Sequence, residues 1–145
     1  MNQKIIDKDQ SINMAIGFLR SNRPLRAEEV CRNYLNNNPG CTEHLRLLSH
    51  SLMKQDRFLE AEEKLRFALS LSPKYPQLYE DLGSVFAMQS RFEEAVHQFE
   101  KALKLQPSLP LAHKKLGHAL AALGRSDEAD DCLLYTSPSP RDVSS

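Results

Sequence analysis

Two cysteines and two histidines in the first third of the chain are residue types that could bind a metal ion. Sulfur and imidazole nitrogen are ligands that Zn²⁺ prefers, and structural zinc sites carry ligand pairs separated by about two to four residues. The two cysteines lie farther apart than that, and the first falls in an apolar column of a repeat described below. We therefore interpret these side chains as structural and expect neither a metal nor a cofactor. They are Cys31, Cys41, His44 and His50.

Paired carboxylates occur at Glu62–Glu63 and at Glu93–Glu94, and carboxylates can perform general acid–base chemistry. Both pairs fall in the expected first turn of a helix, where the helix dipole stabilises negative charge. The sequence contains no glycine-rich phosphate loop, nucleophile elbow or zinc-protease helix. We expect that this chain is not an enzyme.

The charge balance of the chain limits its partners. It carries 19 basic and 19 acidic residues over 145 positions, so its formal net charge is zero. Proteins that bind nucleic acid or anionic membranes show a basic excess, so we expect neither partner. No apolar stretch is long enough to span a bilayer, and the N-terminus lacks the apolar core of a secretory signal. Three cysteines at irregular spacing favour a cytoplasmic location.

One period of 34 residues runs along the sequence. The segment at 55–73 aligns with the segment at 89–107 at glutamine, arginine, phenylalanine, glutamate, alanine, leucine and proline positions. An internal repeat of this length predicts a stack of similar structural units. The recurring columns are Arg23, Arg57, Arg91 and Arg125; Ala27, Ala61, Ala95 and Ala129; and Pro39, Pro73 and Pro107.

Within each unit, apolar residues recur with the spacing of two successive helices. Ser90 and Glu93 have the spacing of a capping box, which predicts that Ser90 caps the second helix. Gly83 leaves a notch on the first helix that a large neighbour such as Phe86 or Phe99 can fill. We expect the side chains of the turn arginines to cover the carbonyls at the end of the preceding helix.

The segment AVHQFEKALKLQP, at 95–107, resembles the tetratricopeptide repeat in its alanine, aromatic, alanine and proline positions. Tyr79 stands where that family often has tryptophan, and Cys31 and Tyr34 make the first unit the most divergent. The resemblance implies an all-α, right-handed α-solenoid of antiparallel helix pairs, with three full repeats and one truncated repeat. The expected divisions are a disordered N-terminus at 1–7, full repeats at 8–41, 42–75 and 76–109, a truncated repeat at 110–131, and a non-native or disordered tail at 132–145.

The periodic pattern stops near Leu134, and the residues that follow are typical of turn and coil. The segment CLLYTSPSPRD, at 132–142, resembles a translated sequencing adapter, so we interpret 132–145 as non-native. We expect the natural protein to continue beyond this point. The truncated last unit then lacks a polar cap, and we expect fraying or self-association at that end.

One stripe of each first helix points away from the expected core. In the tetratricopeptide family, this stripe lines the concave groove that binds extended or helical peptides. Arg46, Glu80 and Lys114 alternate in sign, which leaves two interpretations open: ion pairs between neighbouring repeats, or a partner groove of mixed polarity. Asp81 and Leu111 depart from the basic clamp of the chaperone-binding members, so we do not expect a chaperone clamp. The candidate groove residues are Arg46, His50, Lys54, Glu80, Asp81, Ser84, Lys114, Lys115 and His118.

These features predict a non-catalytic scaffold that binds a protein, a peptide or another domain of its own chain. A second hypothesis comes from the segments at 66–73 and 111–125, which are similar to the N-terminal repeat regions of bacterial proteins that end in a sulfotransferase domain. The repeats would then serve an enzyme whose catalytic domain lies outside this chain. A phosphosulfate-binding loop after the repeats would favour that hypothesis, and further repeats would favour a scaffold.

Overall fold

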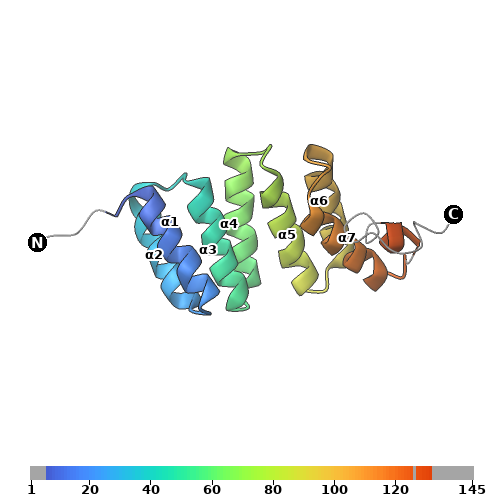
Figure 1. Cartoon of the computed structure of the whole chain (residues 1–145), viewed down its shortest axis with the longest axis horizontal. Coiled ribbons are helices and arrows are strands. Elements are labelled where there is room, and N and C mark those ends of the chain that lie inside the picture. The colour runs from blue at the N-terminus through green and yellow to red at the C-terminus, as the bar shows by residue number, and fades with distance from the viewer. Residues whose placement is uncertain (1–5, 126, 132–145) are drawn as a thin grey trace, which may run out of the picture. The chain divides into compact units, whose positions relative to one another are not determined.

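The chain is a succession of helices in the computed structural model, which describes residues 6–125 and 127–131 (Figure 1). It divides into two compact units, Met1–Pro73 and Lys74–Ser145. The first unit contains α1 (Lys8–Arg20), α2 (Pro24–Asn37), α3 (Thr42–Lys54) and α4 (Phe58–Leu71). The second contains α5 (Pro76–Met88), α6 (Phe92–Leu105), α7 (Pro110–Ala122) and a helical stretch at 127–131. No strand occurs in the described residues, and the expected all-α class is confirmed.

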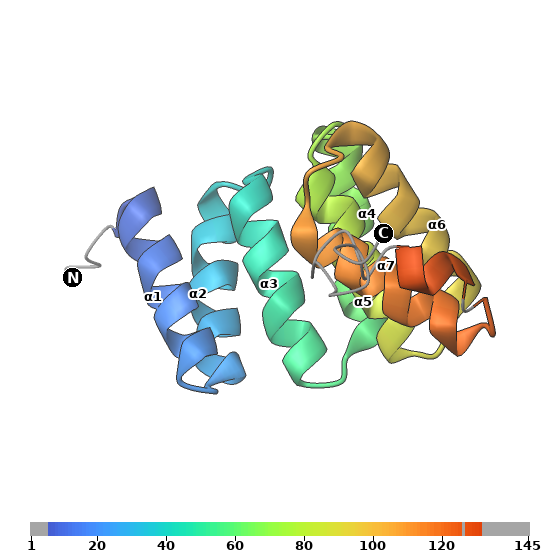
Figure 2. The same ribbon diagram turned by 45° about the vertical axis from the view of Figure 1, so that its right-hand side comes forward.

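The helices of the first unit pack as two hairpins. We call α1 with α2 hairpin 1, and α3 with α4 hairpin 2. Besides its contact with α4, α3 packs against both helices of hairpin 1, and Figure 2 shows α1, α2 and α3 side by side. The hydroxyls of Thr42 and Ser72 lie 3.0 Å apart and tie the start of α3 to the end of α4. In this unit, α3 is thus in contact with α1, α2 and α4.

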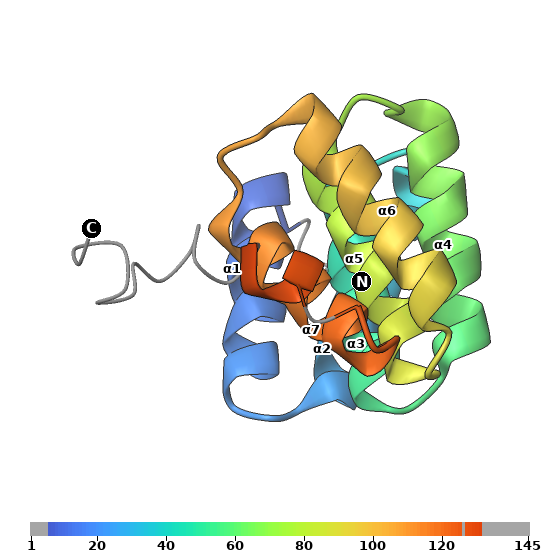
Figure 3. The same cartoon turned by 90° about the vertical axis from the view of Figure 1, so that its right-hand side faces the viewer.

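The second unit repeats this arrangement with α5, α6 and α7. The contact between α5 and α6 forms a hairpin, and α7 packs against both of its helices (Figure 3). Ala102, Leu109 and Ala112 form a buried cluster between α6 and α7, with Tyr79 and Leu103 packed against it. The small alanine side chains allow the helices to approach closely.

Each hairpin turn combines one left-handed residue with the arginine that follows it. In the turn after α5, Ser90 has a φ of 60°, and the N–H of Arg91 donates to the carbonyl of Phe86 at 2.9 Å. The carbonyl of Arg91 then accepts a hydrogen bond from the N–H of Ala95 at 3.0 Å, which begins α6. The other turns repeat both hydrogen bonds at the same columns. The left-handed residues are Asn22, Asp56, Ser90 and Gly124, and the arginines are Arg23, Arg57, Arg91 and Arg125.

The predicted capping box at Ser90 and Glu93 is wrong. The N-cap of α6 is Arg91, and no side chain of the described residues caps this helix. Only three residues, Gln89, Ser90 and Arg91, separate α5 from α6, so the chain must reverse its direction sharply there. A residue in the left-handed conformation does this at the end of a helix. Ser90 therefore ends α5 and does not cap α6.

The predicted notch at Gly83 is confirmed. A Cβ atom built on Gly83 would lie 2.5 Å from Cε1 of Phe99, which is closer than carbon atoms pack. Phe99 and Phe86 are each 1% exposed. The missing side chain of Gly83 is therefore the space that the ring of Phe99 fills, and it sets the approach of α6 to α5.

The first helix begins with a capping box. The N–H of Gln10 donates to the carboxylate of Asp7 at 2.7 Å, and the N–H of Asp7 donates to the side-chain oxygen of Gln10 at 3.3 Å.

Of the segment expected to be disordered, 1–5 lies outside the described residues, as does the adapter-like tail at 132–145. The division of the chain into repeats stays a prediction. None of the described helices is long and apolar enough to cross a membrane.

Candidate functional site

The predicted groove residues of the first unit lie along α3. Arg46, His50 and Lys54 recur every four residues, which places them on one face of the helix. Arg46 and His50 are half-buried, and Lys54 is exposed. This face therefore borders the packed interior at its start and reaches solvent at Lys54.

The predicted groove residues of the second unit meet in an ion pair between α5 and α7. The Nζ atom of Lys115 lies 3.1 Å from Oε1 of Glu80. Glu80 and Asp81 are only 5% and 4% exposed, and the hydroxyl of Ser84 donates to the carbonyl of Glu80 at 3.1 Å. Of the two interpretations of the alternating charges, ion pairing between neighbouring repeats thus applies to Glu80. Its partner is Lys115 and not Lys114.

Burial divides the predicted set into packing residues and surface residues. The carboxylates of Glu80 and Asp81 are buried, so they place no open negative charge on the surface. The side chains of Lys54, Lys114 and His118 are exposed. We call these three the exposed stripe residues. In both units, the solvent-facing part of the predicted groove therefore carries basic or imidazole side chains.

His44 lies at the centre of a polar cluster that joins α3 to hairpin 1. Its ring is 0% exposed and stacks on Tyr34, with ring centroids 3.9 Å apart. Its Nδ1 atom lies 3.0 Å from Sγ of Cys41, and its Nε2 atom is hydrogen-bonded to Oγ of Ser11. Because the hydroxyl of Ser11 donates to the carbonyl of Lys8 at 3.0 Å, Ser11 must accept the proton of Nε2. Nδ1 is then an acceptor that faces the thiol of Cys41, and the same thiol lies 3.5 Å from Oε2 of Glu43.

No group of three or more histidine, cysteine or acidic side chains in the described ranges is placed to hold a metal ion. Cys41 and His44 come together, but burial raises the pKa of the Cys31 thiol to about 12, which keeps that sulfur protonated. Burial also raises the pKa of Cys41 and lowers the pKa of His44. The neutral forms of this pair are therefore favoured, and their hydrogen bond fastens the start of α3.

Three of the four turn arginines pair with glutamates through their side chains, whereas Arg23 forms no ion pair within the described residues. The expected contact of these side chains with helix-end carbonyls stays a prediction. Nη2 of Arg91 lies 2.6 Å from Oε2 of Glu94, and its guanidinium lies 4.4 Å from the centroid of the Phe86 ring. The other predicted carboxylate pair, Glu62–Glu63, also has an arginine partner, because Glu62 accepts a hydrogen bond from Nε of Arg66 at 2.9 Å. These carboxylates thus stabilise turns and helix surfaces. The turn pairs are Arg57–Glu60, Arg91–Glu94 and Arg125–Glu128.

Comparison with known proteins identifies the repeat. Residues 89–124 match the family model of the TPR, or tetratricopeptide, repeat. No curated protein sequence matches the chain. TTC0263, a thermophilic TPR protein of Thermus thermophilus, superposes with a TM-score of 0.83 at 21% identity, over 95% of this chain and 78% of that chain. MamA of Desulfovibrio magneticus RS-1 superposes with a TM-score of 0.78 at 19% identity, over 96% and 78% of the two chains.

Part of a larger enzyme also resembles this chain. A mutant O-GlcNAc transferase of Thermobaculum terrenum has a TM-score of 0.73 at 26% identity, over 80% of this chain and 23% of that chain. Together with the similarity to TTC0263, this confirms the predicted fold class, a solenoid of repeated helix hairpins.

Proposed function

Because the chain is a tetratricopeptide-repeat protein, we propose that it is a non-catalytic scaffold that binds a partner protein or peptide along its first helices. The function needs no moving part or reacting group. Helices held by packed hairpins present fixed side chains, so a partner that binds them loses little free energy to ordering of the receptor.

The exposure of basic side chains on the candidate stripe carries this proposal. Lys54 of the first unit and Lys114 and His118 of the second are exposed, while the nearby carboxylate of Glu80 is neutralised by Lys115. A peptide with acidic side chains is complementary to the exposed stripe residues of either unit taken by itself. Its charge would speed association and favour it over a basic competitor.

Selection of peptides displayed on phage, followed by calorimetric titration, tests the proposal. The selected peptides are expected to be rich in aspartate and glutamate. Lys54→Glu and Lys114→Glu should each weaken their binding by roughly fivefold, because each replaces an attraction with a repulsion. Lys104→Glu is the matched control, since Lys104 is exposed on the second helix α6. Equal affinity in all three variants would remove the stripe as the binding surface.

A second candidate function is the repeat region of a larger bacterial enzyme, with a sulfotransferase as the predicted type. The similarity to part of an O-GlcNAc transferase chain favours it, because repeats of this fold occur there within an enzyme. The complete reading frame distinguishes the two candidates. A catalytic domain after the repeats would support the enzyme, and further repeats would support the scaffold.

Two other expectations belong to this proposal. We propose a cytoplasmic location, for which the sequence argument is the irregular cysteine spacing. We also propose that the C-terminal end of the repeats associates with other copies, since Leu111 is 59% exposed there. Sedimentation velocity at increasing concentration tests the association, and a single monomer peak throughout would exclude it.

A further inference from the structure

The outer side of α1 is exposed at positions that are buried in α3, α5 and α7, the first helices of the later repeats. Met14 is 40% exposed. Gly17 is also exposed, and a Cβ atom on it would meet nothing within 4 Å, whereas Ser51 in the same column is 0% exposed. Within the described residues of the first unit, no element covers this side of hairpin 1. The residues in the column of Met14 are Leu48, Leu82 and Leu116, which are 1%, 1% and 7% exposed.

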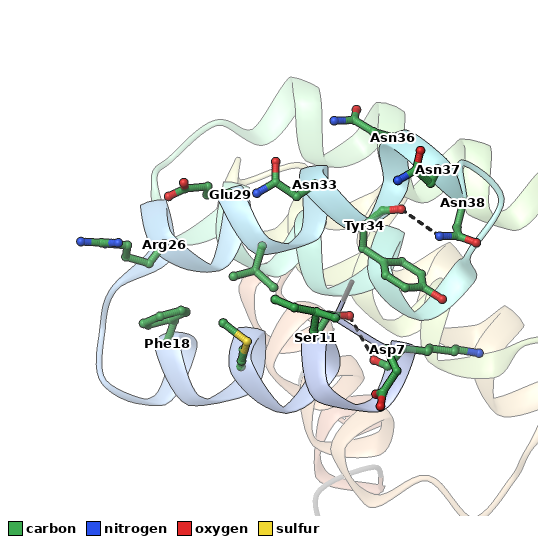
Figure 4. A pocket seen from close by; sticks show the side chains of 14 residues that line it. Asp7, Ser11, Phe18, Arg26, Glu29, Asn33, Tyr34, Asn36, Asn37 and Asn38 are labelled. Carbon is green, nitrogen blue, oxygen red and sulfur yellow. Dashed lines mark hydrogen bonds between the residues drawn. The ribbon is translucent and has the colours of Figure 1, made fainter. Parts of the chain in front are cut away.

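Met14 lines a groove of about 920 Å³ between α1 and α2. Met14 and Phe18 of α1 and Val30 of α2 give it an apolar lining, and Asn33 and Tyr34 lie along its α2 side. Figure 4 shows Phe18 on α1 and the row of polar side chains on α2 across the groove from it. We call these five residues the N-terminal groove. Its lining matches the apolar side of an amphipathic helix.

Hairpin 2 shows which kind of element covers the equivalent face. There α2 packs on α3, and two of its charged side chains reach the start of α4. The carboxylate of Glu28 accepts from Nη1 of Arg57 at 2.8 Å and from Nε2 of Gln55 at 3.0 Å, and Nη2 of Arg32 lies 3.3 Å from Oε2 of Glu60. Burial alone would raise the pKa of Glu28, but these hydrogen bonds lower it, so the carboxylate is charged. The covering helix α2 thus pairs one acid, Glu28, and one base, Arg32, with residues of opposite charge at the start of α4.

Hairpin 1 presents two bases at the corresponding receptor positions. By the 34-residue period, Arg23 stands where hairpin 2 has Arg57, and Arg26 stands where it has Glu60. Both arginines are exposed, and neither forms an ion pair or side-chain hydrogen bond within the part of the chain that the structure describes. A helix like α2 would bring Arg32 against Arg26. A helix with carboxylates at both positions would instead pair with both arginines.

We propose that the N-terminal groove binds an amphipathic helix of a partner protein that carries two carboxylates four residues apart. The partner helix lies on α1 as α2 lies on α3. Its apolar side covers Met14 and Phe18, and its carboxylates face Arg23 and Arg26. This surface lies outside the exposed stripe residues, so the inference does not depend on the proposed function.

Two synthetic peptides with blocked ends test the proposal by NMR titration of the full chain. The acidic peptide has the sequence of residues 24–38 with Cys31→Ala and Arg32→Glu, and the basic peptide keeps Arg32. The acidic peptide is expected to shift the amide signals of α1 and to bind roughly two- to fivefold more tightly than the basic peptide. In the chain variant Arg26→Glu, this order should invert, because the charge at that position is reversed.

A matched pair of variants checks the apolar contact. Met14→Glu should weaken binding of the acidic peptide by about tenfold, because it places a carboxylate where the partner helix would cover an apolar side chain. Asn13→Glu adds the same charge at the adjacent exposed position of α1 and should leave the affinity unchanged. Circular dichroism verifies that both variants fold. Equal affinities in the two variants, amide shifts outside hairpin 1, or an order of peptides that does not invert in Arg26→Glu would each overturn the proposal. So would a concentration-dependent dimer that Met14→Glu abolishes, since a second copy would then cover the groove.

Discussion

At the scale of single residues, the hairpin turns place different side chains in the same backbone conformation. The left-handed position holds asparagine, aspartate, serine and glycine at Asn22, Asp56, Ser90 and Gly124, with φ values of 59°, 58°, 60° and 78°. Glycine adopts this conformation without a steric cost, and asparagine and aspartate tolerate it better than serine does. The turn at Ser90 therefore carries strain that the other three turns lack or share only in part.

We expect Ser90→Gly to stabilise the second unit by about 0.5–1 kcal/mol, because it relieves this strain. Urea unfolding followed by circular dichroism measures the change. The reverse replacement, Gly124→Ser, is the control and should destabilise by a similar amount. A loss of stability in Ser90→Gly would show that the serine side chain contributes more than its conformation costs.

The buried histidine predicts a dependence of stability on pH. Burial lowers the pKa of His44 in the folded chain, whereas the unfolded chain retains a value near 6.5. As the pH falls through about 6.5, the unfolded state takes up the proton first, so the free energy of unfolding decreases. Above that pH the stabilisation from neutral His44 is fully present.

Unfolding by urea between about pH 7.5 and 5.5 measures this dependence. His44→Gln, which introduces the residue that hairpin 1 has in the same column at Gln10, should flatten the decrease. His50→Gln on the same helix serves as the control and should preserve it. A decrease of the same slope in all three proteins would assign the pH dependence to other groups.

At the scale of helices, two glycines in the same kind of helix predict opposite effects of one substitution. Gly17→Ala should stabilise by roughly 0.5–1 kcal/mol, because alanine favours helix and the new Cβ meets nothing within 4 Å. Gly83→Ala should destabilise, because its Cβ would lie 2.5 Å from the ring of Phe99, and overpacking costs about 1–3 kcal/mol. Thermal unfolding of the two variants in parallel gives the comparison. Two shifts of the same sign would contradict it.

Helix positions were predictable from the sequence where they follow from the 34-residue period, but local motifs and charge partners were not. The pattern of Ser90 and Glu93 fits a capping box, yet the backbone hydrogen bond from Arg91 to Phe86 makes Ser90 the turn residue. Glu80 was assigned no definite partner, because the rotation between neighbouring helices decides whether Lys114 or Lys115 faces it. Such contacts depend on packing between helices and not on spacing within one helix.

At the scale of the whole molecule, the sequence predicts the repeat fold because the same pattern of residues recurs in each repeat. The alanine column, the glycine at Gly83 and the turn arginines all require hairpins of one length. Binding surfaces have no such redundancy. The N-terminal groove could have been found only by asking which residue breaks a column, as Arg26 does among Glu60, Glu94 and Glu128. The proposed groove therefore rests on a difference between repeats, whereas the fold rests on their similarities.

The arginine at position 26 also bears on misassembly during refolding. While α3 and α4 are unfolded, α2 lacks the neighbour on which it packs in the folded unit, and it could lie on the exposed side of α1 in another copy. Arg32 would then face Arg26, whereas hairpin 2 offers it Glu60. This contact between like charges disfavours pairing of partly folded copies.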